Sequence, residues 1–139
     1  MDNCDYKVGP VNNATICLNK PASATRVVPE FKKTDKSVDW RTWNVVGSVK
    51  DQGSCASDFA FSSTGAAESA YAIKTGKLFD LSEQFLVDCD TSSFGCSGGF
   101  PTTSSALLSI KGAIQEIDYP YTGKQSKCHS QDTQSVFKL

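Results

Sequence analysis

Six cysteines in a chain of 139 residues narrow what this sequence can fold into more than any other feature. So many thiols are unusual in a cytosolic domain, and their even number favours a disulfide framework formed in an oxidising compartment. Zinc binding is the competing interpretation, but the sequence has no Cys-x-x-Cys pair, and His129 is its only histidine. We therefore expect disulfides and no metal site. The cysteines are Cys4, Cys17, Cys55, Cys89, Cys96 and Cys128.

Length and charge exclude several classes of partner. The length corresponds to one ordinary domain. Because 14 basic residues nearly balance 15 acidic ones, we expect no nucleic-acid partner. No apolar run approaches the roughly 18 residues needed to cross a bilayer, and the amino terminus lacks the basic and apolar regions of a signal peptide. We expect no membrane partner and no cofactor.

Residues 1–36 are predicted to form an arm or linker that precedes a domain of residues 37–139. Polar, basic and turn-prone stretches fill this segment, which shows little apolar periodicity. A bridge between Cys4 and Cys17 would pin it, although free or partner-linked thiols remain open alternatives. Asn13 begins an Asn-Ala-Thr triplet, which fits the rule for N-glycosylation. Asn13 is therefore a predicted glycosylation site.

The domain itself is predicted to contain three helices. The first covers residues 57–74, ends before Gly76, and carries an apolar stripe that is expected to face the core. A second, short helix follows Ser82, which offers an N-cap. After a loop over residues 90–101, rich in small residues, a third helix spans residues 102–111. The stripe of the first helix consists of Phe61, Ala66, Ala70 and Ile73.

The residues around the start of the first helix carry a family resemblance. Residues 52–62 read Gln-Gly-Ser-Cys-Ala-Ser-Asp-Phe-Ala-Phe-Ser, and they resemble the nucleophile segment of papain and the cathepsins, whose core is Cys-Gly-Ser/Ala-Cys-Trp/Tyr. Further motifs follow that family's order and extend the resemblance over about residues 37–139. They are Val38-Asp39-Trp40-Arg41, Leu81-Ser82-Glu83-Gln84, Val87-Asp88-Cys89-Asp90, Gly95-Cys96-Ser97-Gly98-Gly99 and Tyr119-Pro120-Tyr121.

The resemblance implies a mainly α fold. It points to the helical, or left, half of a cathepsin L-like cysteine peptidase, with three helices and disulfide-stapled loops, and without the β-barrel-like second domain. It also implies the bridges Cys55–Cys96 and Cys89–Cys128. Each bridge would close a loop of roughly 40 residues and stabilise the fold by about 4 kcal/mol in the chain-entropy model. With Cys4 bonded to Cys17 as well, no thiol would remain free.

Asp58 occupies the position at which the resemblance places the nucleophilic cysteine. A thiol protease needs a cysteine that becomes a thiolate at a helix N-terminus beside a histidine. Asp58 has no sulfur, and a carboxylate is a far weaker nucleophile toward an amide. An aspartate in the first turn of a helix is favoured by the dipole, by about 0.3 to 1 kcal/mol. We therefore expect a structural role for Asp58.

Other parts of the family's site are kept. Gln52 matches the glutamine that helps to form the oxyanion hole, and Gly98 and Gly99 match a loop that hydrogen-bonds an extended substrate, although both glycines could equally serve only the turn. The family's histidine and asparagine lie about 130 to 150 residues beyond the nucleophile, and too few residues follow Asp58 to reach them. His129 follows Cys128 in a polar stretch and is expected to be a surface residue.

These features predict a catalytically inactive peptidase homologue that acts as a binding or structural module. We expect it in an extracellular, lysosomal or vacuolar compartment. The face that would pack against a second domain is expected to bind a protein or a peptide. Two alternatives remain: a fragment or one chain of a cysteine endopeptidase that needs a second domain, and a protease inhibitor or substrate trap.

Overall fold

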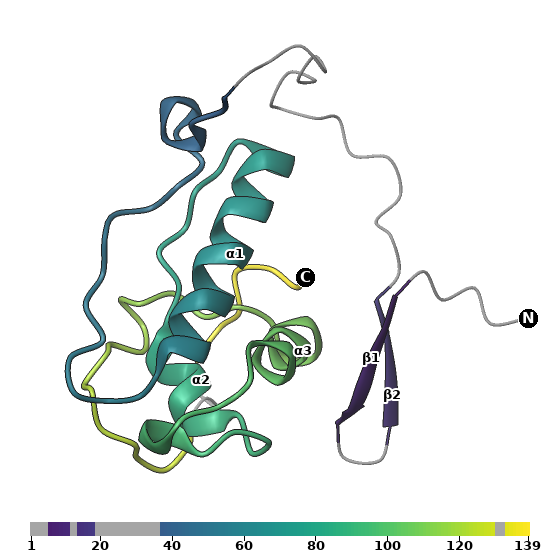
Figure 1. Ribbon diagram of the computed structural model, residues 1–139, viewed down its shortest axis with the longest axis vertical. Helices are drawn as coiled ribbons and strands as arrows, with labels where there is room; N and C mark the ends of the chain where they lie inside the picture. The colour runs from purple at the N-terminus through teal and green to yellow at the C-terminus, as the bar shows by residue number, and fades with distance from the viewer. Residues whose placement is uncertain (1–5, 12–13, 19–36, 130–132) are drawn as a thin grey trace, which may run out of the picture.

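The computed structural model describes residues 6–11, 14–18, 37–129 and 133–139. The three predicted helices are confirmed, and they form a mainly helical unit with two short 3-10 turns (Figure 1). One of these turns lies inside the segment that was predicted as a loop over residues 90–101. The elements are η1 (Trp40–Trp43), α1 (Asp58–Thr75), α2 (Glu83–Cys89), η2 (Gly95–Ser97) and α3 (Pro101–Lys111).

Local signals explain where the helices begin and end. The Ser82 side chain accepts a hydrogen bond of 3.0 Å from the Phe85 N–H, as expected for an N-cap at the start of α2. Pro101 occupies the first turn of α3, where a missing N–H costs nothing. Gly76 ends α1 with a φ of 77°, a left-handed conformation that glycine adopts without steric cost.

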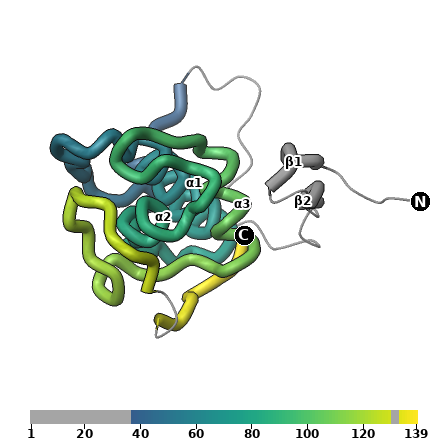
Figure 2. The backbone as a smooth tube through the Cα atoms, turned by 90° about the horizontal axis from the view of Figure 1, so that it is seen from below, coloured from purple at the N-terminus to yellow at the C-terminus, as the bar shows by residue number. Residues whose placement is uncertain are grey.

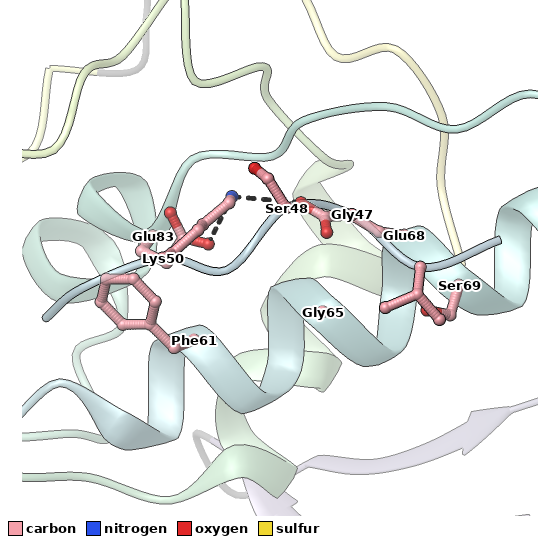
Figure 3. A pocket seen from close by; sticks show the side chains of 9 residues that line it. Gly47, Ser48, Lys50, Phe61, Gly65, Glu68, Ser69 and Glu83 are labelled. Carbon is pink, nitrogen blue, oxygen red and sulfur yellow. Dashed lines mark hydrogen bonds and ion pairs between the residues drawn. The ribbon is translucent and has the colours of Figure 1, made fainter. Parts of the chain in front are cut away.

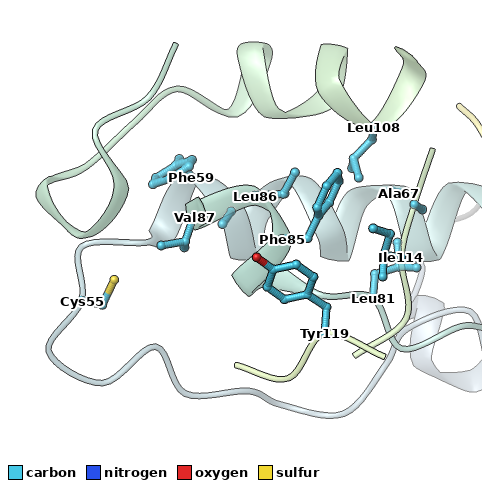
Figure 4. Close-up of a cluster of buried hydrophobic side chains, with 12 residues drawn as sticks. Cys55, Phe59, Ala67, Leu81, Phe85, Leu86, Val87, Leu108, Ile114 and Tyr119 are labelled. Atoms are coloured by element: carbon cyan, nitrogen blue, oxygen red, sulfur yellow. The ribbon is translucent and has the colours of Figure 1, made fainter. Parts of the chain in front are cut away.

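The core lies where α2 meets α1 and the segments that follow α3. Phe85, Leu86 and Val87 of α2 are each at most 1% exposed, so this short helix is buried on nearly all sides. Figure 4 shows Phe85 and Leu86 between α1, α3 and the ring of Tyr119. Each such side chain contributes about 1.5 to 3 kcal/mol through burial. Tertiary packing therefore stabilises α2, which is too short to be stable alone.

The buried face of α1 differs from the predicted one. Ala66 and Ala70 of the expected stripe are exposed, and Phe61 and Ile73 are only partly buried. The buried face instead combines apolar and hydroxyl side chains. Small side chains there let α2 and α3 approach α1 closely. The Ser63 hydroxyl donates to Phe59 O within the helix at 2.8 Å, whereas the Thr64 hydroxyl donates to Glu83 Oε1 of α2 at 2.6 Å. The buried residues are Phe59, Ala60, Ser63, Thr64, Ala67, Glu68 and Ala72.

Both disulfides that the resemblance implied for the helical unit are present. Cys55 is bonded to Cys96, and Cys89 is bonded to Cys128. The first bridge joins the segment before α1 to η2, and the second joins the end of α2 to the segment after Tyr121. Such bridges fit an oxidising compartment. Cys4 lies outside the described residues, so the Cys4–Cys17 bridge remains a prediction.

An antiparallel hairpin precedes the helical unit. Strand β1 (Tyr6–Val11) pairs with β2 (Ala14–Leu18), and Lys7 lies opposite Cys17. The prediction of an arm or linker over residues 1–36 did not include these strands. Two valines in β1 and one isoleucine in β2 favour extended structure, but they are too few to stand out beside the polar residues. Asn13 lies outside the described residues, so its glycosylation remains a prediction.

The carboxy-terminal segment returns to the helical unit. The Ala113 N–H donates to Phe137 O at 2.7 Å, and the Val136 N–H donates to Ala113 O at 2.8 Å. The Phe137 ring stacks on Tyr71 of α1 with centroids 4.0 Å apart. Figure 2 shows this end of the chain on the α3 side of the unit. The last residues thus cover the carboxy-terminal half of α1.

Candidate functional site

Asp58 is the first residue of α1, as predicted. Its side chain is exposed, and within the described part of the chain its carboxylate takes no part in a hydrogen bond or ion pair. The unpaired N–H groups of a helix start favour an acidic side chain at this position. Asp58 therefore places a solvent-facing carboxylate at the amino end of α1.

The segment before Asp58 is held by hydrogen bonds to distant residues. The Gln52 side-chain amide donates to Cys55 O at 3.0 Å, which turns it toward the loop that leads into α1. The Tyr121 hydroxyl donates to Gln52 O at 2.8 Å and lies 2.7 Å from Ser57 Oγ. Ser57 precedes α1 and is fully buried. This loop is therefore anchored at both of its ends by one tyrosine.

Gly98 and Gly99 lie next to the start of α1. The Ala56 N–H donates to Cys96 O at 3.1 Å, and with the Cys55–Cys96 disulfide it joins the two loops. Gly98 has a φ of 113°, which side chains rarely adopt. A Cβ on Gly99 would lie 2.6 Å from Ser93 Cβ and 2.8 Å from Phe59 Cγ, so packing excludes a side chain there. The fold thus brings Gln52, Asp58, Gly98 and Gly99 into one region. Backbone conformation at Gly98 and close packing at Gly99 each explain why the residue is a glycine.

A buried carboxylate holds this glycine loop against α3. Asp90 is only 7% exposed. Its Oδ2 accepts bonds of 2.8 Å from the hydroxyls of Ser93, Thr103 and Ser104, and its Oδ1 accepts one of 3.0 Å from the Ser92 N–H. A carboxylate that accepts several hydrogen bonds is a strong anchor. Sequence reasoning missed this role, because the hydroxyl donors come from both the loop and the helix after it.

Two exposed phenylalanines flank the glycine loop. Phe94 is 63% exposed and Phe100 is 54% exposed, and their rings meet edge to face with centroids 6.4 Å apart. Exposed aromatic pairs are more typical of binding surfaces than of random surface. Sequence reasoning missed them too, although two phenylalanines on either side of a Gly-Gly pair were a usable signal.

A pocket of about 250 Å³ lies between α1 and the segment of residues 46–50 (Figure 3). Lys50 Nζ reaches Asp80 Oδ1 at 2.6 Å, Glu83 Oε1 at 2.8 Å and Glu68 Oε1 at 3.3 Å. Burial by itself would lower the pKa of Lys50, but its bonds to Asp80 and Glu83 outweigh this effect and raise it. Burial raises the pKa of Glu68. The pocket therefore holds an ion-pair network, and its lining contains no cysteine. Its lining is Val46, Gly47, Ser48, Lys50, Phe61, Gly65, Glu68, Ser69 and Glu83.

His129 is a surface residue, as predicted. Its ring is exposed and stacks on Tyr119 with centroids 4.1 Å apart, and its Nδ1 lies 2.9 Å from the Tyr119 hydroxyl. That hydroxyl donates to Asp88 Oδ2 at 2.9 Å. Burial and, to a smaller extent, the hydrogen bond to Asp88 raise the pKa of Tyr119 to about 12. Among the described residues, His129 Nδ1 contacts the Tyr119 hydroxyl and Lys127 O, and it makes no hydrogen bond to Gln52 or Asp58.

Metal-binding clusters and membrane-spanning helices are both absent from the described residues, which are 6–11, 14–18, 37–129 and 133–139. In that part of the chain, no three His, Cys, Asp or Glu side chains are grouped so that they could hold a metal ion. Over the same residues, no helix is long and apolar enough to span a bilayer.

A family model described as "Papain family cysteine protease" matches residues 34–138. The chain belongs to the papain family. Among its relatives in the family, cathepsin F of Drosophila melanogaster is 45% identical over 111 residues, which are 78% of this chain and 18% of that protein. Chymopapain of Carica papaya is 46% identical over 97 residues, which are 70% of this chain and 28% of that protein.

Solved structures of papain-family proteins share the fold. A Carica candamarcensis cysteine protease in complex with E-64 superposes with a TM-score of 0.70 at 39% identity, covering 72% of this chain and 47% of that one. The recombinant stem bromelain precursor gives a TM-score of 0.72 at 31% identity, covering 81% of this chain and 39% of that one. This chain therefore spans less than half the length of each of these papain-family proteins.

Proposed function

We propose that this papain-family chain is a catalytically inactive homologue that binds extended peptides beside the amino end of α1. The observation that carries the proposal is the carboxylate of Asp58, which begins α1 where the family motif has its nucleophilic cysteine. The four cysteines of residues 37–129 are all in disulfides. No thiol in that part of the chain is available for acyl transfer.

The chemistry of a carboxylate supports inactivity. A carboxylate is a weaker nucleophile than a thiolate, so attack by Asp58 on a peptide carbonyl would be slow. Expulsion of the amine would then leave a reactive anhydride. The Gln52 amide is retained and supplies a hydrogen-bond donor. A donor that binds substrate and transition state equally increases the affinity for the substrate but does not accelerate the chemical step. Binding is therefore the function that these residues support best.

The backbone of the glycine loop supports a peptide ligand. Gly98 uses its N–H and its carbonyl inside the loop, with bonds to Gly95 O at 3.3 Å and from the Phe94 N–H at 2.8 Å. The N–H and C=O of Gly99 take part in no hydrogen bond within the described residues. They are free to pair with an extended backbone, as in strand addition. Phe94 and Phe100 would then contact an apolar side chain of the peptide.

We further propose that a second protein unit covers the face around the Lys50 pocket. Val49 is completely exposed and Val46 is 42% exposed beside this pocket. Contiguous exposed apolar surface often marks a site of contact with another protein. Since the relatives are much longer than this chain, the occupant would be the remaining part of the family fold, in the same or another polypeptide. Light scattering that finds a strict monomer at millimolar concentration, with or without such a unit, would contradict this part of the proposal.

The compartment is part of the proposal as well. The disulfides Cys55–Cys96 and Cys89–Cys128 support extracellular, lysosomal or vacuolar residence, because reducing compartments do not maintain such bridges.

The second candidate is one chain of an active peptidase. The observation that favours it is the short span of the match, which is 18% of cathepsin F and 28% of chymopapain. A partner could supply a histidine, but it could not supply sulfur at Asp58. Labelling with an epoxide probe and cleavage of fluorogenic peptides distinguish the two candidates. We expect neither signal, and labelling or turnover by the purified chain would overturn inactivity.

Calorimetric titration with an extended peptide that carries a bulky apolar residue tests binding. We expect Phe100→Ala to weaken binding by about tenfold, in line with loss of one buried aromatic contact. Ile110→Ala is the matched control, because Ile110 is also half exposed but lies near the other end of α3, about 15 Å along the helix. Equal affinities in the two variants would remove Phe100 from the proposed groove.

A further inference from the structure

We propose that Tyr121 is the positioning residue of the candidate cleft. Its hydroxyl joins the main chain of Gln52 to the side chain of Ser57, and so sets where the Gln52 amide stands relative to the first turn of α1. The effect on peptide binding rests on the proposed function, whereas the positioning itself does not.

The hydrogen bonds at the Tyr121 hydroxyl have a defined direction. Gln52 O is a carbonyl and can only accept, so the single Tyr121 proton points to it across 2.8 Å. The single Ser57 proton then has two acceptors within reach, the Tyr121 oxygen at 2.7 Å and Cys55 O at 3.3 Å, and the shorter contact favours donation to Tyr121. The relay therefore runs from Ser57 through Tyr121 to Gln52.

This relay replaces an ordinary helix cap. Ser57 stands at the N-cap of α1, where a serine side chain usually accepts a bond from the second or third residue of the helix. It makes no such bond, and its hydroxyl contacts Tyr121 and, at 3.3 Å, Cys55 O. Because Ser57 is fully buried, water cannot replace these partners. The start of α1 is thus secured by a residue 64 positions later in the chain.

Tyr121 is itself held firmly enough to act as a reference point. Its N–H donates to Glu116 Oε1 at 2.7 Å. Its ring meets Phe61 of α1 edge to face, with centroids 5.0 Å apart and an interplanar angle of 82°. The next residue, Thr122, donates through its N–H to Gln84 Oε1 at 2.8 Å. The hydroxyl position is therefore determined by α1, by α2 and by its own turn.

Tyr121→Phe removes the hydroxyl and leaves the ring. Tyr119→Phe is the matched control, because it also removes a hydrogen-bonded hydroxyl, in this case one bound to Asp88. We expect Tyr121→Phe to accelerate amide hydrogen exchange of residues 52–60 by about tenfold, the effect of losing about one buried hydrogen bond. Tyr119→Phe should leave exchange in these residues unchanged. Equal acceleration in both variants would overturn the proposal.

Ser57→Ala provides an independent measurement on the same relay. We expect it to accelerate exchange in the same residues, and we expect the double variant Ser57→Ala/Tyr121→Phe to exceed the larger single effect by less than twofold, since both remove one relay. Multiplying effects would mean that the two hydroxyls act separately, which contradicts the proposal. The single variant Ser57→Ala also keeps the proposal testable if Tyr121→Phe disturbs folding.

Peptide titration then separates positioning from binding. If the natural chain binds the peptide, Tyr121→Phe should weaken binding three- to tenfold while Tyr119→Phe leaves it unchanged. Unchanged affinity in Tyr121→Phe would show that the relay does not serve the cleft. If the natural chain binds no peptide, the proposed function fails, while the exchange measurements still decide whether Tyr121 positions Gln52.

Discussion

Phe59 lies directly beneath Gly99, so close that a Cβ on this glycine would come within 2.8 Å of Phe59 Cγ. The ring belongs to the first turn of α1, and the glycine belongs to the loop that leads into α3. Their contact brings the amino end of α1 and the glycine loop together. A side chain at Gly99 would therefore collide both with Phe59 of α1 and with Ser93 of its own loop, whose Cβ would lie 2.6 Å from the added Cβ.

Gly99→Ala is accordingly expected to destabilise the fold by about 1 to 3 kcal/mol, as overpacking usually does. Gly65→Ala is the matched control, since Gly65 lies inside α1 and a Cβ there meets no atom within 4 Å. It should stabilise the fold by about 0.5 to 1 kcal/mol through helix propensity. Urea unfolding of both variants gives the two values. A neutral Gly99→Ala would contradict the close packing of Gly99 against Phe59 and Ser93.

Lys50→Met tests the ion-pair network under the Lys50 pocket. Glu83 is 1% exposed and Glu68 is 4% exposed, so removing the ammonium group leaves buried carboxylates without their counter-charge. We expect a loss of about 3 kcal/mol at pH 7. Lys111→Met, at an exposed position on α3, should change stability by less than about 0.5 kcal/mol.

The pH dependence of the Lys50→Met deficit has a definite sign. Burial already raises the pKa of Glu68, and the charge of Lys50 opposes that rise. Without Lys50 the folded state therefore binds the Glu68 proton more tightly than the unfolded state does, so the variant gains stability as pH falls. The difference from the natural chain should therefore shrink between pH 7 and pH 4. A deficit that stays constant over this range would show that lost packing, and not lost charge, causes the effect.

Tyr119 is expected to ionise late. Its pKa is raised to about 12, because burial and the bond to Asp88 both oppose a phenolate. An unfolded tyrosine ionises near pH 10. The folded state therefore holds this proton more tightly, and the stability that Tyr119 contributes declines as pH rises above about 10. An ultraviolet titration should show one tyrosine step near pH 12 that is absent from Tyr119→Phe.

Asp58→Cys tests the environment at the start of α1. A cysteine at a helix N-terminus has a lowered pKa and reacts readily as a thiolate. We expect the variant to be alkylated by iodoacetamide at pH 7 faster than an unstructured cysteine peptide, with the natural chain as the baseline. Amide cleavage should remain undetectable, because no histidine contacts this position in the described residues. Slow alkylation would contradict the exposed placement of Asp58.

Local sequence patterns were sufficient to predict the three helices and the position of Asp58 at the start of the first one. Capping residues and the glycines that end helices act over a few neighbours, so Ser82 and Gly76 could be interpreted without knowledge of the fold. The pairing of Cys55 with Cys96 and of Cys89 with Cys128 followed from the family resemblance, since counting alone allows many pairings. The buried face of α1 was misjudged, because Ala66 and Ala70 follow helical spacing but have no partner helix.

The sequence by itself determined the order and type of the helices, the oxidising chemistry of the cysteines and the absence of sulfur at residue 58. Only the tertiary structure decided that Ser57 bonds Tyr121 in place of capping α1, that Phe59 supports Gly99, and that Lys50 meets three carboxylates. Helix signals act between neighbours a few residues apart. The partners of a hydroxyl, a ring or a charge depend on how segments far apart in the chain pack together, and a local sequence pattern does not contain that information.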